Sequence, residues 1–147
     1  MNLVLTCDHG GYKLKEEIKK LLTGWGIEFA DYGVFTEDSV DYPKLAFTAC
    51  QAIVSGQFAR GILICGTGIG MSIAANRVRG IRAALCADVF SARMSREHND
   101  ANVLCLGGRV LDTESAGEIV KTWLHTQPAD GRHNRRRAMI DEYVDKD

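Results

Sequence analysis

The chain has 147 residues, of which 46% are hydrophobic and 25% charged, with a formal net charge of -1 at pH 7. This length predicts one domain, residues 1–147, and the near-neutral charge gives no indication of a nucleic-acid or membrane partner. No apolar run approaches the roughly 20 residues that a membrane span needs, and the N-terminus lacks secretion-signal features, so we expect a cytoplasmic protein.

Strand-like and helix-like segments alternate along the chain. Apolar runs bounded by turn residues predict strands at residues 2–6, 28–32, 61–65, 82–86 and 102–106. Helical periodicity predicts helices at residues 12–25, 45–54, 71–78, 89–98, 113–125 and 132–144, with a loop at 40–43. Asp88 and Thr113 are candidate N-caps for two of these helices.

The alternation predicts an α/β protein with a three-layer αβα, Rossmann-like fold. Every strand-to-strand connection is long enough for a right-handed crossover, so we expect a five-stranded parallel sheet plus a C-terminal helix. The leading strand order is the flavodoxin-like 2-1-3-4-5. Ligands bind such sheets at the carboxyl ends of strands 1 and 3, where the loops are residues 7–11 and 65–70.

The second of these loops places a thiol among glycines. Cys65 is followed by glycines at positions 66, 68 and 70, at the start of a predicted helix. Met71 stands where a dinucleotide fingerprint needs glycine and where a phosphatase loop needs arginine, and no Walker A motif is present. The loop could be a tight turn with an incidental cysteine. It could also be an anion cradle, where a helix N-terminus makes Cys65 a base or nucleophile.

Five cysteines occur, and no two are close in sequence. Without a CxxC motif, neither a disulfide framework nor structural zinc is expected. We interpret Cys50, Cys86 and Cys105 as small buried apolar residues.

Histidines and an aspartate follow other predicted elements. Asp8 and His9 end the first strand and could contact a hydroxylated ligand, although Asp8 could simply cap the next helix. His98 ends the fourth helix, a position that is also typical of a surface residue compensating the helix dipole.

Arginines gather in the last third of the chain. Arg109 follows the fifth strand, and Arg132 and Arg136 share one face of the last helix, which suits a phosphate but also fits a solvated surface. Arg135 and Arg137 are expected to be solvated. A thiolate base, an oxyanion cradle, a histidine acid and phosphate-binding arginines suit proton abstraction next to a carbonyl in a phosphorylated sugar, with no cofactor and no metal.

The whole chain resembles the ribose-5-phosphate isomerase B family, whose wider group includes galactose-6-phosphate and allose-6-phosphate isomerases. The matching segments, in order, are CDHGGYKLK (7–15), DYP (41–43), GILICGTGIGMSIAANR (61–77), SREHNDANVL (95–104) and GRH (131–133). The resemblance implies interconversion of ribose 5-phosphate and ribulose 5-phosphate through an enediolate. It also implies a homodimer or homotetramer with sites completed between subunits.

Roles for the thiol loop follow from the resemblance. Cys65 would move the proton between C2 and C1, and Thr67 would steady its thiol. The backbone N–H groups of the loop would hold the oxyanion; these belong to Gly66, Thr67, Gly68, Ile69 and Gly70. One branch of the family uses a glutamate base, but residues 72–75 contain no acid, so the chain resembles the cysteine branch.

Other roles follow in the same way. His98 would be the acid that opens the furanose ring, with Asp8 and His9 at the ring oxygens. Asn99 would bind a sugar hydroxyl or the enediolate. The phosphate would be bound by Arg109, Arg132 and Arg136.

Three alternatives stay open at this point. The substrate could be a six-carbon sugar phosphate. The chain could be a non-catalytic module that binds a sugar phosphate. A thiol redox role is the third, in which Cys7 would approach Cys65 across adjacent strands.

Overall fold

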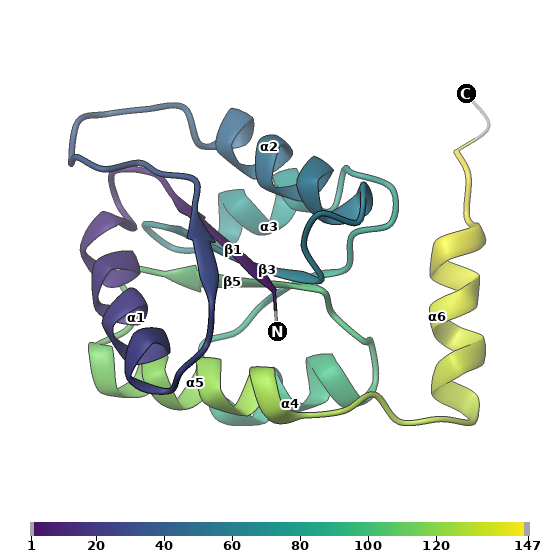
Figure 1. Ribbon diagram of the computed structural model, residues 1–147. Helices are drawn as coiled ribbons and strands as arrows, with labels where there is room; N and C mark the ends of the chain where they lie inside the picture. The colour runs from purple at the N-terminus through teal and green to yellow at the C-terminus, as the bar shows by residue number, and fades with distance from the viewer. Residues whose placement is uncertain (1, 146–147) are drawn as a thin grey trace.

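The structure, a computed structural model, describes residues 2–145 as three layers (Figure 1). The middle layer is a parallel sheet of β1 (Leu3–Cys7), β2 (Phe29–Asp31), β3 (Arg60–Cys65), β4 (Ala83–Leu85) and β5 (Val103–Gly107). The helices are α1 (Tyr12–Gly24), α2 (Tyr42–Val54), α3 (Ile69–Ala75), α4 (Val89–Glu97), α5 (Thr113–His125) and α6 (Arg132–Glu142). The predicted α/β class and parallel five-stranded sheet are confirmed.

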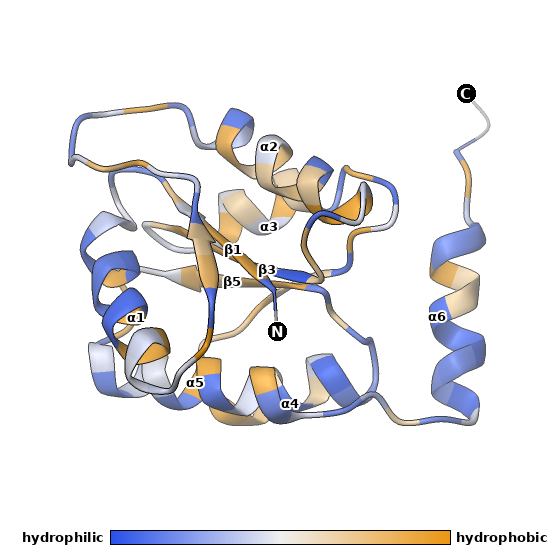
Figure 2. Ribbon diagram, viewed as in Figure 1, coloured by the Kyte–Doolittle hydropathy of each residue, from blue (hydrophilic) through white to orange (hydrophobic). Residues whose placement is uncertain are grey.

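Apolar strands explain why helices cover both faces of the sheet. Every residue of β1 and β5 is buried, as parallel strands between two helical layers require. Helices α1, α4 and α5 pack on one face, and α2 and α3 on the other. Figure 2 shows hydrophobic residues along the strands and hydrophilic ones on the outer sides of the helices.

The order of the strands corrects one detail of the prediction. The sheet runs β2-β1-β3-β5-β4, so the last two strands are exchanged relative to the expected 2-1-3-4-5. The physical reason lies in burial: β5 is fully buried and pairs with β3, whereas β4 has three residues and ends at the exposed Leu85. A short, partly exposed strand fits an edge, and a fully buried one fits the centre.

Several boundaries differ from those predicted. Helix α2 begins at Tyr42 and takes in part of the predicted loop, because Pro43 is tolerated in a first helical turn. The side chain of Asp112, not Thr113, accepts the capping hydrogen bond of α5, from Ser115 N–H at 2.7 Å. Asp88 caps α4 as predicted, through Ser91 N–H at 2.6 Å.

The last helix is shorter than predicted and ends at Glu142. In Figure 1 it stands apart from the three layers. Among residues 2–145, no helix combines the length and the apolar character that crossing a membrane requires.

Candidate active site

Three loops meet at the carboxyl ends of β1, β3 and β5. These strands are neighbours, with Cys7 opposite Ile64 and Cys65 opposite Gly107. Hydrogen bonds join the loops that follow: Gly108 N–H donates to Cys65 O at 2.8 Å and Arg109 N–H to Gly66 O at 2.9 Å. The predicted meeting of the Asp8 and Cys65 loops is confirmed. The exchanged strand order adds the Arg109 loop, which an intervening β4 would have kept one strand farther away.

Glycines allow the loops to approach this closely. A Cβ built on Gly10 would lie 3.0 Å from Gly66 N, and one built on Gly108 would lie 2.5 Å from Gly10 O. Backbone therefore packs on backbone, where any side chain would separate the loops.

Cys65 lies at the centre of this meeting point. Its side chain is buried, and its Sγ accepts a hydrogen bond from Gly68 N–H at 3.2 Å. Gly68 has φ +79°, a left-handed conformation that turns its N–H back toward the sulfur. The hydrogen bond places a backbone donor directly beside the thiol sulfur.

The other cysteines lack this environment. Burial raises the pKa of Cys7 and Cys86 to about 11 and that of Cys50 to about 12. Burial also raises the pKa of Cys105 well above its ordinary value. These thiols stay neutral near pH 7. Cys50, Cys86 and Cys105 are buried, as predicted from the sequence.

The redox alternative does not fit the geometry. Cys7 is opposite Ile64 in the ladder, and both belong to the core on the α1 side of the sheet. Cys65 is the next residue of β3, so its side chain points to the other face, into the core on the α2 side. Cys7 and Cys65 are therefore separated by the sheet and are not placed to form a disulfide.

Thr67 and two of the loop N–H groups form hydrogen bonds within the loop itself. Thr67 Oγ1 accepts a hydrogen bond from Ile69 N–H at 3.2 Å. The group that donates to Cys65 Sγ is Gly68 N–H. The N–H groups of Gly68 and Ile69 thus already have partners inside the loop.

Asp8 and His9 stand beside this loop. Asp8 is buried, and its Oδ1 accepts hydrogen bonds from Gly10 N–H at 2.9 Å and Gly11 N–H at 3.2 Å, so it shapes the turn before α1. His9 Nδ1 accepts from Val40 N–H at 3.3 Å. Its proton is then on Nε2, and the neutral ring presents a donor.

Arg109 lies across both loops. A Cβ built on Gly66 would be 3.2 Å from Arg109 Nη1, and one on Gly10 would be 3.4 Å from Arg109 Cζ. The guanidinium borders a hollow of about 220 Å³, whose lining residues are His9, Gly10, Lys13, Glu37, Gly108 and Arg109. Lys13 Nζ lies 3.7 Å from Glu37 Oε1 in this hollow, and the Arg109 guanidinium can hold an anionic group there.

Three residues near this loop were not predicted as site residues from the sequence. Lys13 could have been found, since it lies in the first turn of α1, directly after the loop of residues 7–11. Glu37 belongs to an exposed loop and carries no such signal. Tyr42 packs on the thiol loop: a Cβ built on Gly70 would lie 2.6 Å from Tyr42 Cζ.

The remaining predicted residues lie at the opposite end of the sheet, where the strands begin. His98 ends α4, and Asn99 follows it, before β5 begins. Asn102 O accepts a hydrogen bond from Gly61 N–H, near the start of β3. Cys65 is at the far end of that strand, and a strand of this length spans roughly 16–20 Å. Figure 1 shows the arrowhead of β5 pointing away from α6.

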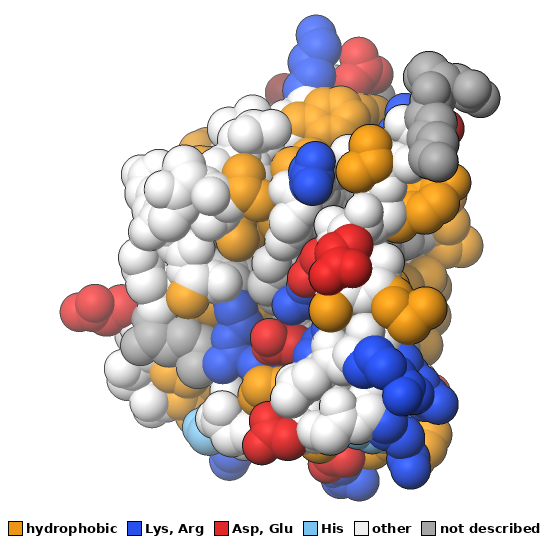
Figure 3. Space-filling view, turned by 90° about the vertical axis from the view of Figure 1, so that its right-hand side faces the viewer, with side chains coloured by type: hydrophobic (Ala, Val, Ile, Leu, Met, Phe, Trp, Pro, Cys, Tyr) orange, Lys and Arg blue, Asp and Glu red, His pale blue; other side chains and the backbone are white. Residues whose placement is uncertain are grey.

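Residues of this second group contact one another across α4 and α6. The His98 ring stacks on His133, with centroids 4.3 Å apart and planes 9° from parallel. Burial lowers the pKa of His133, as do the positive charges of His98 and three arginines of α6. Arg132 and Arg136 are exposed. Figure 3 shows basic side chains gathered low on this face, below hydrophobic ones.

Arg137 is buried, although the sequence predicts that it is solvated. It is 8% exposed, not solvated, and donates to His98 O at 3.0 Å and Ala129 O at 2.8 Å. Arg135 is exposed, as expected.

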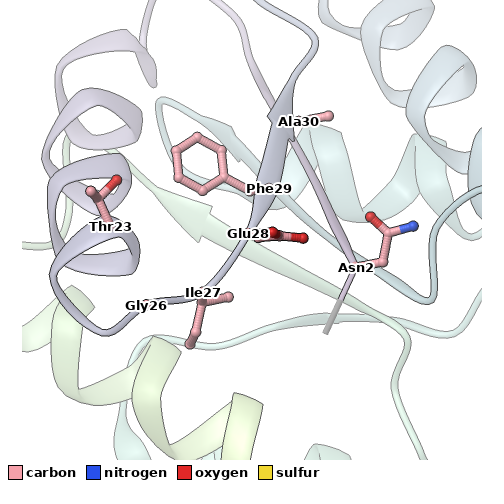
Figure 4. A pocket seen from close by; sticks show the side chains of 7 residues that line it. All are labelled: Asn2, Thr23, Gly26, Ile27, Glu28, Phe29 and Ala30. Carbon is pink, nitrogen blue, oxygen red and sulfur yellow. The ribbon is translucent and has the colours of Figure 1, made fainter.

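A larger hollow elsewhere carries no comparable chemistry. An open groove of about 590 Å³ borders β2; Figure 4 shows its lining residues, Asn2, Thr23, Gly26, Ile27, Glu28, Phe29 and Ala30. It lies toward the amino ends of β1 and β2, away from Cys65. Among residues 2–145, no group of three or more His, Cys, Asp or Glu side chains could hold a metal ion.

The fold is that of an open α/β protein, a class in which ligands bind beyond the carboxyl ends of central parallel strands, and the three loops meet at that place. The chain belongs to the Ribose/Galactose Isomerase family, whose sequence profile matches residues 3–140.

Individual members are similar over most of their length. The solved structure of ribose-5-phosphate isomerase B from Clostridium thermocellum is 51% identical, covers 97% of this chain and 96% of that one, and has a TM-score of 0.95. Ribose-5-phosphate isomerase B of Escherichia coli is 48% identical over 88% of this chain and 87% of its own. D-erythrulose-4-phosphate isomerase of Pectobacterium atrosepticum is 42% identical, over 86% and 84%.

Proposed function

We propose that this chain is a cofactor-independent aldose–ketose isomerase that interconverts ribose 5-phosphate and ribulose 5-phosphate. One observation carries the proposal: the buried thiol of Cys65 accepts a backbone N–H hydrogen bond at the point where three loops meet beside Arg109. Family membership and the two similar ribose-5-phosphate isomerases support this choice of substrate.

The reaction would proceed by proton transfer from C2 to C1. The Cys65 thiolate takes the proton from C2 of the open-chain aldose, and the electron pair moves to the C1 carbonyl oxygen, giving an enediolate. The C2 hydroxyl proton passes to the C1 oxygen, the Cys65 thiol returns the abstracted proton to C1, and the electron pair left on the C2 oxygen forms the ketone, so that C1 ends as a hydroxymethyl group and Cys65 as the thiolate. The N–H groups of Gly66, Thr67 and Gly70 stabilise the negative oxygen, while Gly68 N–H donates to the sulfur.

Ring opening and phosphate binding would need a second copy of the chain. Four predicted site residues lie at the amino ends of the strands, whereas Cys65 lies at a carboxyl end, so they are too far from the thiol to act on the same small sugar. They are His98, Asn99, Arg132 and Arg136. We therefore propose a homodimer in which α4 and α6 of one subunit complete the site at Cys65 of the other. His98 is then the ring-opening acid.

The phosphate would lie between the two subunits. Arg109 approaches it from the loop after β5, and Arg132 and Arg136 approach from α6 of the second copy. Asp8 holds the turn that carries His9, which donates from Nε2 to an oxygen of the sugar. A dianion between three guanidinium groups is well matched in charge and shape.

Substitution of the thiol tests the base. Cys65→Ala should lower kcat by on the order of 10²–10⁴-fold while substrate binding persists, because only the proton acceptor is lost. Exchange of the C2 hydrogen in deuterated water should stop as well. Cys50→Ala, another buried cysteine on the same side of the sheet, is the matched control and should keep its activity. Retention of more than a few per cent of kcat in Cys65→Ala would contradict the assignment.

Substrate length is tested separately. The family includes a similar enzyme named for a four-carbon substrate, so chain length is not constant among the relatives. An assay of ribose 5-phosphate against D-erythrulose 4-phosphate, allose 6-phosphate and galactose 6-phosphate should give the highest kcat/KM with ribose 5-phosphate. Binding of all four without turnover would instead support a non-catalytic sugar-phosphate-binding module.

A further inference from the structure

Helix α6 is attached to the rest of the molecule through few side chains. It stands beside the three layers rather than within them (Figure 1). Arg137 is the buried residue among the described residues of this helix. What holds α6 therefore also decides where Arg132 and Arg136 point.

Arg137 binds the carboxyl end of α4 through hydrogen bonds. Its Nη1 donates to Glu97 O at 3.3 Å and to His98 O at 3.0 Å, and its Nη2 donates to Ala129 O at 2.8 Å and to the Asn134 side chain. The last carbonyls of a helix lack partners within it and attract positive charge. One guanidinium thus joins the end of α4, the linker before α6, and α6 itself.

The turn that carries His98 needs such support. Asp100 has φ +45°, an uncommon conformation for a residue other than glycine. Arg82 holds the other side of this turn, donating through Nε to Asn99 O at 2.7 Å. Arg82 Nη1 also binds both carboxylate oxygens of Asp141, at 2.8 and 2.9 Å, so it fixes the far end of α6.

The stacked imidazoles report on this arrangement. His133 is four residues before Arg137 on the same helix, so its ring meets the His98 ring only if α6 and the end of α4 keep their register. Arg132 and Arg136 move with the same helix. His98 and the α6 arginines therefore form one unit, joined by Arg137 at the His98 backbone and by Arg82 at the far end of α6.

We propose that Arg137 is a positioning residue: it locks the His98 backbone to α6, so that the acid and the two arginines enter the second copy's site together. This inference rests on the proposed function for its kinetic consequence. Its structural part, the dependence of the His98–His133 stack on Arg137, does not.

The test compares Arg137→Met with Arg135→Met, an exposed arginine of the same helix. Arg137→Met should lower kcat and raise KM together, each by about 10-fold or more, because misplaced catalytic groups lose rate steeply with distance. The ring-current shifts that the stack imposes on the imidazole protons of His98 and His133 should disappear in the NMR spectrum. Arg135→Met should leave kcat, KM and these shifts unchanged.

A conservative variant separates positioning from folding. Arg137→Lys keeps a positive charge but loses the fork that reaches two carbonyls, so it should recover only part of kcat and of the imidazole shifts. It also carries the test if Arg137→Met does not fold.

Two results would overturn the inference. One is a stack that persists in both Arg137 variants; the other is wild-type kcat and KM in a variant that has lost the stack. If the wild-type protein does not isomerise ribose 5-phosphate, the proposed function fails, and the imidazole shifts alone still decide whether Arg137 positions His98.

Discussion

At the scale of single residues, local sequence pattern identifies Cys65 but does not reveal the burial of Arg137. Cys65 is recognisable in the sequence because glycines and a helix start follow it, and in the structure its sulfur accepts a hydrogen bond from Gly68 N–H. The expectation that Arg137 is solvated is wrong, because its burial depends on carbonyl groups about forty residues earlier in the chain. A pattern of neighbouring residues does not contain such information.

Gly68 offers a test at the residue scale. A Cβ at this position would lie 2.6 Å from Leu85 Cδ1 and 2.9 Å from the Leu106 backbone, in addition to the strain of φ +79°. Gly68→Ala should therefore move its N–H away from Cys65 Sγ and lower kcat at least tenfold. The control is Gly56→Ala, where φ is +87° but no atom lies within 4 Å. It should cost about 1 kcal/mol of stability and leave kcat intact, as measured by urea unfolding and steady-state kinetics.

Arg136 separates binding from chemistry. Arg136→Ala should raise KM with little change in kcat, because phosphate binding is mostly equal in the ground and transition states. Arg135→Ala, its exposed neighbour, should alter neither constant. A loss that falls entirely on kcat would mean that Arg136 does not act as a phosphate ligand.

At the scale of elements, the exchange of β4 and β5 shows what hydrophobic pattern can decide. Both segments read as strands, and nothing in their sequence spacing orders them. The clue was the apolar character of β5 on both faces, since such a strand belongs inside the sheet. The exchange matters for function because it makes the Arg109 loop a direct neighbour of the Cys65 loop.

A buried ion pair ties α1 to the strand at one edge. Lys15 is fully buried and its Nζ lies 2.6 Å from Asp31 Oδ1 and 2.7 Å from Val34 O. Burial alone would raise the pKa of Asp31, but hydrogen bonds from Lys15, Lys19 and Gly33 N–H outweigh burial and lower that pKa below its ordinary value. The stability gained from this carboxylate is present above its unfolded-state pKa, and it is lost as the pH falls through the lower folded-state pKa.

This sign gives a prediction for acid stability. Asp31→Asn should be less stable than wild type at neutral pH, and the gap in the free energy of unfolding should narrow as the pH falls below about 4. Urea denaturation from neutral to acidic pH measures it. Asp38→Asn, in the exposed loop after β2, is the control and should differ little from wild type at any pH. A gap that widens toward acid would contradict the role given to Asp31.

At the scale of the whole molecule, one chain places the predicted site residues at opposite ends of its sheet, so a complete site would need two subunits. Mixing two inactive variants tests the shared site. Cys65→Ala and His98→Asn, refolded together in equal amounts, should regain about a quarter of wild-type activity, since half of the dimers are mixed and each of these has one intact site. If a single chain forms the complete site, no mixture regains activity.

The sequence by itself determined the α/β class, the parallel sheet, the thiol loop and the family resemblance, because these depend on short-range pattern: period, glycine spacing and segments matched in order. The tertiary structure decided the strand order, the meeting of three loops at Cys65, and the burial of Arg137. It also separated His98 and the α6 arginines from the thiol. These features depend on which distant segments pack together, and packing is a property of the folded chain rather than of any local stretch of it.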